Sequence, residues 1–245
     1  MRIETFRLGR SGKVACALAI GVLTGCGLVS SDIGSFTFQL PSKSFSFDTA
    51  STGWKAPPSY YNVPVPCGAG QAVADCCNPP APAPKPDCSA TPPQLACVSS
   101  LCALQFPFSV NQKIDLKNEV PSLANVGASS LTVTIKKIQY TIASTLNVEL
   151  PAMDIYVAPA TVTTLPDAMA TKFGTVPATP AGATKSGDVI LDAAGQAKFS
   201  QYLSQFTTPF NLIAYTVVVL PSGSPAPTGK VDATVTGTIS AKPNL

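Results

Sequence analysis

The residues with the clearest chemical potential in this sequence are six cysteines between residues 67 and 102. They are Cys67, Cys76, Cys77, Cys88, Cys97 and Cys102. An even number of cysteines clustered in one segment is typical of a disulfide framework in an exported protein, and six cysteines allow about 15 pairings. Because Cys76 and Cys77 are adjacent, we expect each of them to bond to a cysteine elsewhere. The pattern predicts disulfides and leaves their connectivity open.

Metal binding is the alternative chemistry for these thiols, and their spacing makes it the weaker interpretation. Structural zinc sites usually place their ligands in pairs about two to four residues apart. Only Cys97 and Cys102, with four residues between them, have such a spacing, and the chain contains no histidine to complete a site. We therefore predict no metal centre and no cofactor.

The sequence lacks the usual catalytic motifs. Without histidine, a Ser–His–Asp or Cys–His set cannot form. No lysine beyond residue 25 lies three residues after a serine, and no G-x-S-x-G, P-loop or dinucleotide-binding pattern follows a strand-like segment. Three carboxylate pairs remain as acid–base candidates, namely Glu149 with Asp154, Asp115 with Glu119, and Asp188 with Asp192. Solvated surface groups or turn carboxylates explain them more simply, and no D-x-D-x-D-G calcium loop is present, so we expect no enzymatic activity.

Three aromatic residues, Trp54, Tyr60 and Tyr61, lie in or beside the proline-dense stretch from Ala56 to Pro93. Aromatic side chains beside proline often serve recognition, so these three are candidates for a binding surface. The alternative is that they pack over the cysteine-bridged segment or against the rest of the fold. The prolines exclude helix here, and residues 78–87 are typical of an extended polyproline II segment.

The first 25 residues have the three zones of an export signal. Positive charges occur from Arg2 to Lys13, an apolar run extends from Val14 to Thr24, and small residues follow. The apolar run is much shorter than the roughly 20 residues that a transmembrane helix needs. We therefore predict a signal peptide over residues 1–25 that is removed from the mature protein.

The residues Leu23-Thr24-Gly25-Cys26 resemble the lipobox of bacterial lipoproteins. This resemblance implies that Cys26 becomes the new N-terminus and carries acyl chains such as palmitate. It also implies attachment to the outer membrane, because Gly27 stands where an aspartate favours retention in the inner membrane. Each buried methylene of an acyl chain contributes about 0.8 kcal/mol, and more than one chain gives a stable anchor. An ordinary secretory signal with an incidental cysteine is the alternative.

Charge is scarce and balanced once the leader is set aside. The leader holds four basic residues against Glu4, which accounts for the entire net charge of +3. The remainder has as many acidic as basic residues, and every basic one is lysine. Nucleic-acid binding needs a basic surface and usually arginine side chains that grip phosphate. We therefore predict no nucleic-acid partner.

Alternating apolar residues predict strands, because successive side chains of a strand point to opposite faces. Phe36–Phe38 and Phe45–Phe47 are two such pieces, and Pro41–Lys43 between them suggests a hairpin-like bend. Further on, the alternation predicts strands at Leu131–Ile142, Leu146–Leu150 and Met153–Val157. The phase of the first of these slips at Lys136-Lys137, which predicts a β-bulge, and Pro151 separates the other two.

The C-terminal part predicts more strands and one helix. Val189–Leu191 is a short strand, and Ala194–Phe206 is a connecting helix with Phe199, Tyr202, Leu203 and Phe206 on one face. Asn211–Leu220 is apolar enough to be a central strand. The segment 221–229 predicts a turn, after which residues 231–239 alternate as a closing strand. We expect these last two strands to pair as an antiparallel hairpin.

Together these patterns predict an all-β fold. We expect an immunoglobulin-like β-sandwich with one short connecting helix, preceded by a Pro/Cys-rich segment stapled by disulfides. The bulged strand and the hairpin resemble, in architecture alone, immunoglobulin-like or late-embryogenesis-abundant type-14 sandwiches. The expected divisions are a signal peptide at 1–25, the anchor and Pro/Cys-rich segment at 26–103, and the sandwich at 104–245.

The expected function is a structural or interaction role in the cell envelope. The protein would be held at the outer membrane through lipid on Cys26 and would contact envelope or cell-surface proteins. The alternative is a carrier or sensor of an apolar small ligand with a cavity between the sheets. A carboxylate-dependent hydrolase has the least support.

Overall fold

The structure is a computed structural model that describes residues 34–50, 63–67, 76, 94–124, 126–127 and 130–244. Every described residue belongs to one compact unit, Ile33–Leu245. Its strands are β1 (Phe36–Asp48), β2 (Gln94–Val98), β3 (Leu101–Ile114), β4 (Ser130–Ser144), β5 (Met153–Pro159), β6 (Thr171–Val176), β7 (Thr184–Asp188), β8 (Ile190–Leu191), β9 (Phe210–Pro221) and β10 (Lys230–Asn244). Its described helices are α2 (Leu116–Glu119), α3 (Pro121–Ala124) and α4 (Ala193–Ser204).

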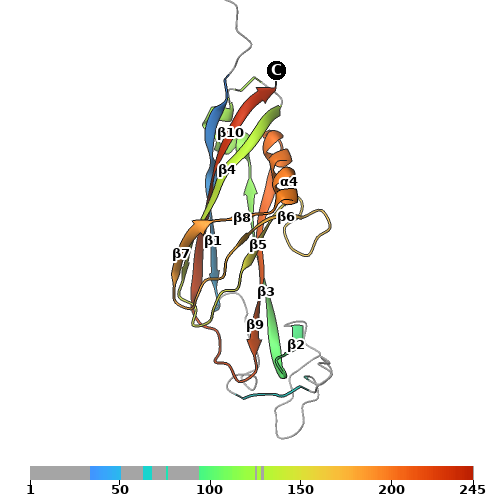
Figure 1. The fold of residues 1–245 in the computed structure, drawn as a ribbon, viewed down its shortest axis with the longest axis vertical. Helices are drawn as coiled ribbons and strands as arrows, with labels where there is room; N and C mark the ends of the chain where they lie inside the picture. Colours follow the sequence, from blue (N-terminus) through green and yellow to red (C-terminus); the bar gives the residue numbers. More distant parts are fainter. Residues whose placement is uncertain are drawn as a thin grey trace, which may run out of the picture. The chain divides into compact units, whose positions relative to one another are not determined.

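The strands form two antiparallel sheets (Figure 1). The four-stranded sheet has the order β1-β10-β4-β7, and the six-stranded sheet has the order β2-β3-β9-β5-β6-β8. Inward-facing side chains of both sheets meet in one apolar core, which includes Phe45 and Ile142 from one sheet and Ile155 and Val218 from the other. The predicted all-β sandwich is therefore confirmed.

The predicted bulge in β4 is also confirmed. Residues Ile135 and Lys137 of β4 lie opposite Ile239 and Thr238 of β10, so Lys136 is the extra residue. The bulge lets Ile135 and Ile138 both point into the core, although three positions separate them. Without an inserted residue, one of the two apolar sets would face solvent.

The predicted bend at Pro41–Lys43 is wrong, because β1 runs through it as one strand. The pairing of β1 with β10 shifts by one residue between Leu40 and Lys43, which absorbs the change of phase as a bulge. Pro41 is tolerated because β1 is an edge strand, where a missing N–H breaks no ladder on the open side.

The predicted hairpin of the last two strands is wrong as well. β9 lies between β3 and β5 in the six-stranded sheet, whereas β10 lies between β1 and β4 in the other sheet. Both edges of β9 are thus at least partly paired with other strands. The connection Ser222–Gly229 is long enough to cross from one sheet to the other, and Gly229 ends it with a φ of 112° that favours glycine.

The strand predicted at Leu146–Leu150 is not a strand. Leu146 and Leu150 are buried, but this segment crosses between the sheets and forms only an isolated bridge between Leu150 and Thr179. The side chain of Asn147 bonds the backbone of Ala226 and Thr228, which holds the crossing in place. The alternation of apolar residues here reflects the burial of Leu146 and Leu150 and not a ladder of paired strands.

The strands at Met153–Val157 and at residues 211–220 are confirmed as β5 and β9, and the short strand near Val189–Leu191 is confirmed as β8.

Helix α4 confirms the predicted connecting helix. Asp192 caps its N-terminus by accepting a hydrogen bond from the N–H of Gly195 at 2.9 Å. Its apolar face packs on β4 and β6. There Phe199 stacks on Phe173 with ring centroids 4.4 Å apart. A Cβ at Gly195 would lie 1.9 Å from the carbonyl oxygen of Lys172, so glycine permits this close approach. Sequence analysis missed α2 and α3, which are each four residues long.

The boundary expected between residues 103 and 104 falls inside β3. β1 belongs to the four-stranded sheet and β2 to the six-stranded sheet, so both are part of the sandwich. The described part of the cysteine-rich segment therefore belongs to the same compact unit as the body.

Candidate functional site

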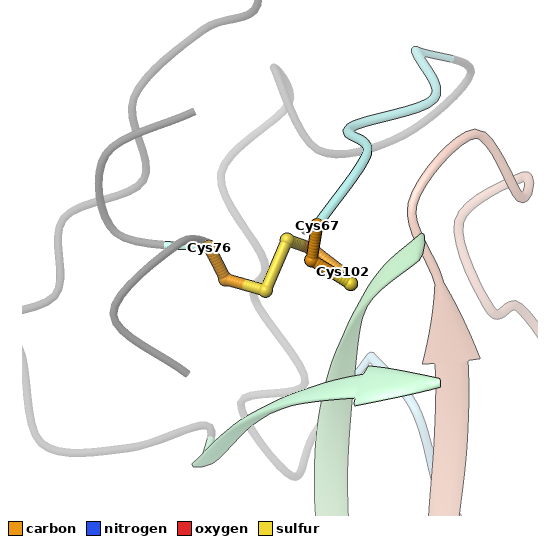
Figure 2. A group of neighbouring side chains, drawn as sticks. All are labelled: Cys67, Cys76 and Cys102. Atoms are coloured by element: carbon orange, nitrogen blue, oxygen red, sulfur yellow. A yellow bond between two sulfur atoms is a disulfide. The ribbon is translucent and has the colours of Figure 1, made fainter. Parts of the chain in front are cut away.

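Four cysteines meet at the end of the six-stranded sheet where β2 and β3 form a hairpin, and Figure 2 shows three of them, Cys67, Cys76 and Cys102. Cys97 on β2 lies directly opposite Cys102 on β3. Ser99 and Ser100 join the strands with φ angles of 53° and 63°. Two consecutive positive φ angles are typical of a type I′ turn, whose twist matches that of the flanking strands.

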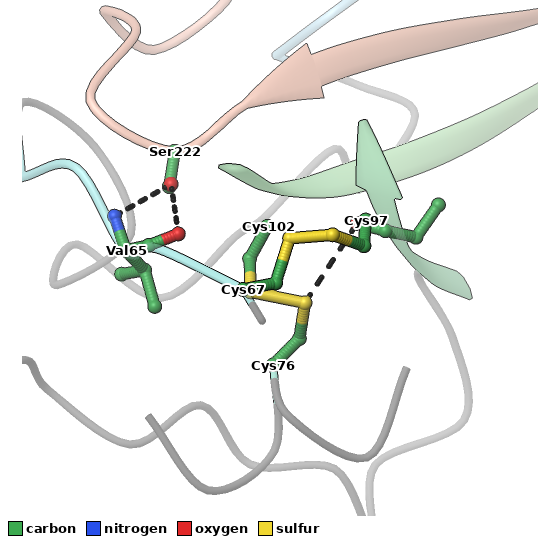
Figure 3. The surroundings of a disulfide bond; sticks show 7 residues. Val65, Cys67, Cys76, Cys97, Cys102 and Ser222 are labelled. Carbon is green, nitrogen blue, oxygen red and sulfur yellow. Dashed lines mark hydrogen bonds between the residues drawn. A yellow bond between two sulfur atoms is a disulfide. The ribbon is translucent and has the colours of Figure 1, made fainter. Parts of the chain in front are cut away.

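The opposed cysteines do not bond to each other. Cys97 is bonded to Cys67 and Cys102 is bonded to Cys76, so each bridge reaches to a distant part of the chain (Figure 3). The Cα–Cα distances are 6.0 Å and 5.4 Å, within the usual range for disulfides. Cys76 thus bonds to a distant cysteine, as its position beside Cys77 predicts. Cys77 and Cys88 lie outside the described residues.

The sulfur atoms of Cys67, Cys76 and Cys102 lie within 4.8 Å of one another, and all three residues are buried. Such a group could hold a metal ion if the thiols were free, but each of these sulfurs is part of a disulfide. The Cys76 sulfur also lies 3.8 Å from the carbonyl oxygen of Ala96 on β2. The arrangement therefore serves cross-linking rather than metal coordination.

The segment Val63–Cys67 is held against this hairpin by its backbone. The N–H of Cys102 donates to the carbonyl of Val65, and the N–H of Cys67 donates to the carbonyl of Ser100. The buried hydroxyl of Ser222 accepts from the N–H of Val65 at 2.8 Å and donates to its carbonyl at 3.2 Å (Figure 3). These bonds fasten the segment to the ends of β3 and β9.

The carboxylate pairs singled out in the sequence have structural roles. Asp115 caps α2, and Glu119 accepts a hydrogen bond from the N–H of Asp115 while pairing with Lys43. Asp188 pairs with Lys137 at 3.3 Å, and Asp192 caps α4 as described above. Glu149 is exposed.

The sixth carboxylate, Asp154, belongs to a polar group on the outer face of the six-stranded sheet. It lies 2.7 Å from the ammonium of Lys172 and accepts a hydrogen bond from the hydroxyl of Thr175 at 3.0 Å. Its hydrogen bond raises the pKa of Lys172. Burial, and then the charge of Asp154, raise the pKa of Tyr156. Tyr215 on β9 lies opposite Asp154, so two tyrosines flank this ion pair.

The outer faces of the two sheets differ in character. On the four-stranded sheet, outward side chains hydrogen-bond across strands, such as Thr238 with Gln39 at 3.0 Å and Ser46 with Asp232 at 2.8 Å. The hydroxyl of Ser46 lowers the pKa of Asp232. This face is polar in the way that strand alternation requires of a solvated surface.

Apolar side chains gather on part of the outer face of the six-stranded sheet, beside polar ones such as Gln105 and Ser109 on β3. Outward positions on β9 and on the neighbouring β2 and β3 carry Tyr215, Val217, Val219, Val98 and Pro107. Val219 is 38% exposed and Val98 is 37% exposed. We call this set, together with Tyr156, the β9 face. The sequence does not reveal this face, because the apolar run of residues 216–220 indicates a central strand, whereas Val219 within it is 38% exposed.

An apolar pocket lies between the sheets. It is lined by Phe45, Phe108, Tyr140, Ile142, Met153, Ile155, Val176, Ala214, Val231, Ala233 and Val235. The space that a water-sized molecule can occupy in it is about 20 Å³. Pockets for small ligands are usually far larger, about 300–1,000 Å³. As it stands, this space admits no more than a small molecule of solvent size.

Several predicted functional residues lie outside the described residues. They are Cys26, the proposed lipid site, and Trp54, Tyr60 and Tyr61, the candidate binding aromatics. Among the helices of the described segments, none is long and apolar enough to cross a membrane.

Comparison with known proteins gives no family for this chain. No protein-family model matches it, and no curated protein matches it. Among solved structures, turnip yellow mosaic virus matches with 16% identity over 58% of this chain and 82% of that chain, at a TM-score of 0.21. Desmodium yellow mottle tymovirus matches with 14% identity over 68% of this chain and 96% of that chain, at a TM-score of 0.21. The Gt strain of infectious bursal disease virus matches with 12% identity over 94% of this chain and 41% of that chain, at a TM-score of 0.23.

Proposed function

We propose that this protein is a non-enzymatic lipoprotein of the bacterial outer membrane that docks a protein partner on the β9 face. The observation that carries the proposal is the contrast between the two outer faces. One is a polar surface whose side chains bond to each other, and the other exposes valine, proline and tyrosine among polar residues of β3 and β5. Exposed apolar patches rimmed by polar groups mark interaction surfaces, and tyrosine is enriched in them.

The charges on the β9 face indicate the chemistry of the partner. Asp154 and Lys172 neutralise each other at 2.7 Å, so this ion pair offers no net charge to a strongly charged partner. Burying an unpaired charge against this face would be costly. The partner surface is therefore uncharged and apolar, and it belongs to a protein of the envelope or cell surface.

Attachment to the membrane rests on Cys26, ten positions before the first residue of β1. Replacing Cys26 by alanine removes the thiol that accepts the lipid. The Cys26→Ala protein is expected either to keep its leader or to leave the membrane fraction. Cell fractionation with mass analysis of the N-terminus measures both. An unchanged membrane fraction with a cut leader would contradict lipid attachment.

Docking on the β9 face is tested by site-specific photo-crosslinking in cells. A photoreactive amino acid is placed at Val219 and, as a matched control, at Thr134, which is exposed on the outer face of the four-stranded sheet. We expect one heavier adduct from position 219 and none from position 134. A second change, Val217→Lys, is expected to abolish that adduct, because it places a charge in the apolar face.

The identity of the adduct decides the outcome. An adduct with one envelope protein that Val217→Lys removes supports the proposal. An adduct with a second copy of this chain, an adduct with lipid alone, or equal labelling from positions 219 and 134 contradicts it. The matched change Thr134→Lys, combined with the photoreactive residue at position 219, controls for the effect of an added charge on folding.

The apolar pocket keeps a carrier of a small apolar ligand as the second candidate. Its lining is entirely apolar, which suits such a ligand, but its volume requires the sheets to move apart. Native mass spectrometry of protein extracted from cells tests this directly. A bound small molecule would favour the carrier, and the mass of the protein alone would count against it. The hydrolase has the least support, because five of its six candidate carboxylates form caps or ion pairs.

A further inference from the structure

Cys67, Cys76, Cys97 and Cys102 can be joined as two disulfides in three ways. The structure contains the bonds Cys67–Cys97 and Cys76–Cys102. The sulfurs of Cys67 and Cys76 also lie within 4.8 Å of each other (Figure 2). Cys97 and Cys102 face each other across the β2–β3 hairpin. Each cysteine therefore has a second partner within reach, and the sulfurs of Cys67 and Cys102 also lie within 4.8 Å of each other.

We propose that these four cysteines form a thiol–disulfide exchange site that converts the long-range pairing into a local one, Cys67–Cys76 with Cys97–Cys102. The site takes a thiol as its co-reactant, either a small thiol or a thiol–disulfide oxidoreductase of the same compartment. This inference does not depend on the β9 face or on lipid attachment.

The backbone of the hairpin is suited to the second pairing. In a hairpin with a two-residue turn, Val98 and Leu101 are the hydrogen-bonded pair next to the turn, so Cys97 and Cys102 form the next, non-hydrogen-bonded pair. Opposed Cα atoms at such positions are about 4.5 Å apart, at the short end of the range that a disulfide spans. The bond Cys97–Cys102 therefore needs no rearrangement of the strands.

Burial selects the sulfur that an external thiol attacks first. Cys67, Cys76 and Cys102 are buried, whereas Cys97 is partly exposed. Thiol–disulfide exchange proceeds by attack of a thiolate on an accessible disulfide sulfur. The external thiolate attacks the Cys97 sulfur, forms a mixed disulfide with Cys97 and displaces the thiolate of Cys67.

Two internal steps complete the exchange. The Cys67 thiolate attacks the Cys76 sulfur, which forms Cys67–Cys76 and displaces the thiolate of Cys102. The Cys102 thiolate then attacks the mixed disulfide at Cys97, which forms Cys97–Cys102 and releases the external thiolate. Each step forms one S–S bond and breaks one, so nothing is oxidised or reduced overall. The proton that the external thiol loses at the start returns to it at the end.

The exchange changes which parts of the chain are tied together. The observed bridges join residues 30 and 26 positions apart and fasten residues 63–67 covalently to the hairpin. The local pairing joins Cys97 only to its hairpin neighbour and Cys67 only to Cys76. The segment Val63–Cys67 is then held to β3 and β9 without a covalent bond, by hydrogen bonds and by the burial of Val65.

The test uses the full mature chain, oxidised, with reduced glutathione at substoichiometric amount. After acid quenching, proteolysis and fragmentation of the linked peptides show which cysteines are joined. We expect peptides linked through Cys67–Cys76 and through Cys97–Cys102 to rise together, in equal amounts, with no net gain of free thiol. Persistence of the original pairs alone across a range of glutathione concentrations would overturn the proposal. So would peptides linked through Cys67–Cys102 and Cys76–Cys97, or peptides that join these cysteines to Cys77 or Cys88.

A variant isolates the internal step. In Cys97→Ser, the Cys67 thiol is free from the start and lies beside the Cys76–Cys102 bond. We expect Cys67–Cys76 to form without added thiol, with a free thiol appearing on Cys102. The double variant Cys67→Ser, Cys97→Ser is the matched control and is expected to keep Cys76–Cys102 unchanged. A Cys97→Ser protein that keeps Cys76–Cys102 with a free Cys67 thiol contradicts the proposal.

Discussion

Glu119 connects α2 to the edge of the four-stranded sheet. Its carboxylate accepts a hydrogen bond from the N–H of Asp115 at 3.1 Å and pairs with Lys43 on β1. The Lys43 and Glu119 side chains are only 15% and 29% exposed, so solvent screens this pair less than an open surface pair. We infer that this ion pair fixes the short helix against β1.

Glu119→Ala removes both interactions and is expected to lower the free energy of unfolding by about 1–2 kcal/mol, the scale of a lost charge-assisted hydrogen bond. Glu119→Gln keeps an oxygen that can accept from Asp115, so its loss is smaller. Urea unfolding of the two variants, and of Lys43→Met alone and combined with Glu119→Ala, measures the coupling. A double variant whose loss equals the sum of the single losses would show that the ion pair contributes nothing.

Tyr156 makes the fold sensitive to alkaline pH. Burial raises its pKa, so the folded protein holds this proton more tightly than the unfolded chain does. The resulting stability is intact below the ordinary tyrosine pKa of about 10 and is lost as pH rises through the raised pKa. The raised pKa of Lys172 acts in the same alkaline range, because its ammonium is hydrogen-bonded to Asp154.

Tyr156→Phe is therefore expected to lose less stability than the wild type between neutral pH and pH above about 10. Urea unfolding at a series of pH values measures this difference. Tyr202→Phe is a parallel test that is expected to change the pH profile in the same direction, because burial also raises the pKa of Tyr202. Identical pH profiles for Tyr156→Phe and the wild type would contradict the assignment.

At the scale of elements, the bulge in β4 sets which side chains enter the core. Lys136 is the inserted residue, and both it and Lys137 are exposed. After deletion of Lys136, only one of Ile135 and Ile138 could point into the core. The side chains on the other side of the deletion would exchange their inward and outward positions. Substituting Lys136 changes only a solvated side chain.

Deletion of Lys136 is thus expected to prevent cooperative folding or to cost several kcal/mol, about the loss of two or more buried aliphatic side chains at roughly 2–5 kcal/mol each. Lys136→Ala is expected to stay within about 0.5 kcal/mol of the wild type. Circular dichroism during heating distinguishes the two variants. A deletion that melts like the wild type would refute the assigned register.

The elements that sequence analysis predicted are those with a local signal. Alternation located β4, β5 and β10, the i, i+3, i+4 spacing located α4, and a phase slip located the bulge. The same signal misled at Leu146 and Leu150, which are buried in a crossing between the sheets. Periodicity reports which side chains are buried, and a ladder additionally needs a neighbouring strand.

At the scale of the whole molecule, the disulfides join parts of the chain that few hydrogen bonds between paired strands connect. Cys76 is attached to β3 through Cys102, at a sequence separation of 26. Cross-linking residues this far apart reduces the freedom of the unfolded chain, an effect of roughly 2–4 kcal/mol per bridge. The bridge therefore stabilises the hairpin end of the six-stranded sheet.

Replacing Cys76 and Cys102 together by serine is expected to lower the free energy of unfolding by roughly 2–4 kcal/mol. The double replacement leaves no free thiol from this bridge that could exchange with Cys67. Guanidinium unfolding without reductant compares it with the wild type. A wild type that is no more stable than this variant would show that the bridge has no stabilising role.

The sequence by itself determined the all-β composition, the register break in β4, the helix α4 and the presence of disulfides. These follow from the periodicity of apolar residues and from the number of cysteines, both of which are local properties. Only the tertiary structure decided that β9 and β10 lie in different sheets, that Cys97 bonds to Cys67 rather than to Cys102, and that Val219 is exposed. Each of these depends on which distant segment lies alongside, and neither spacing nor composition encodes that neighbour directly.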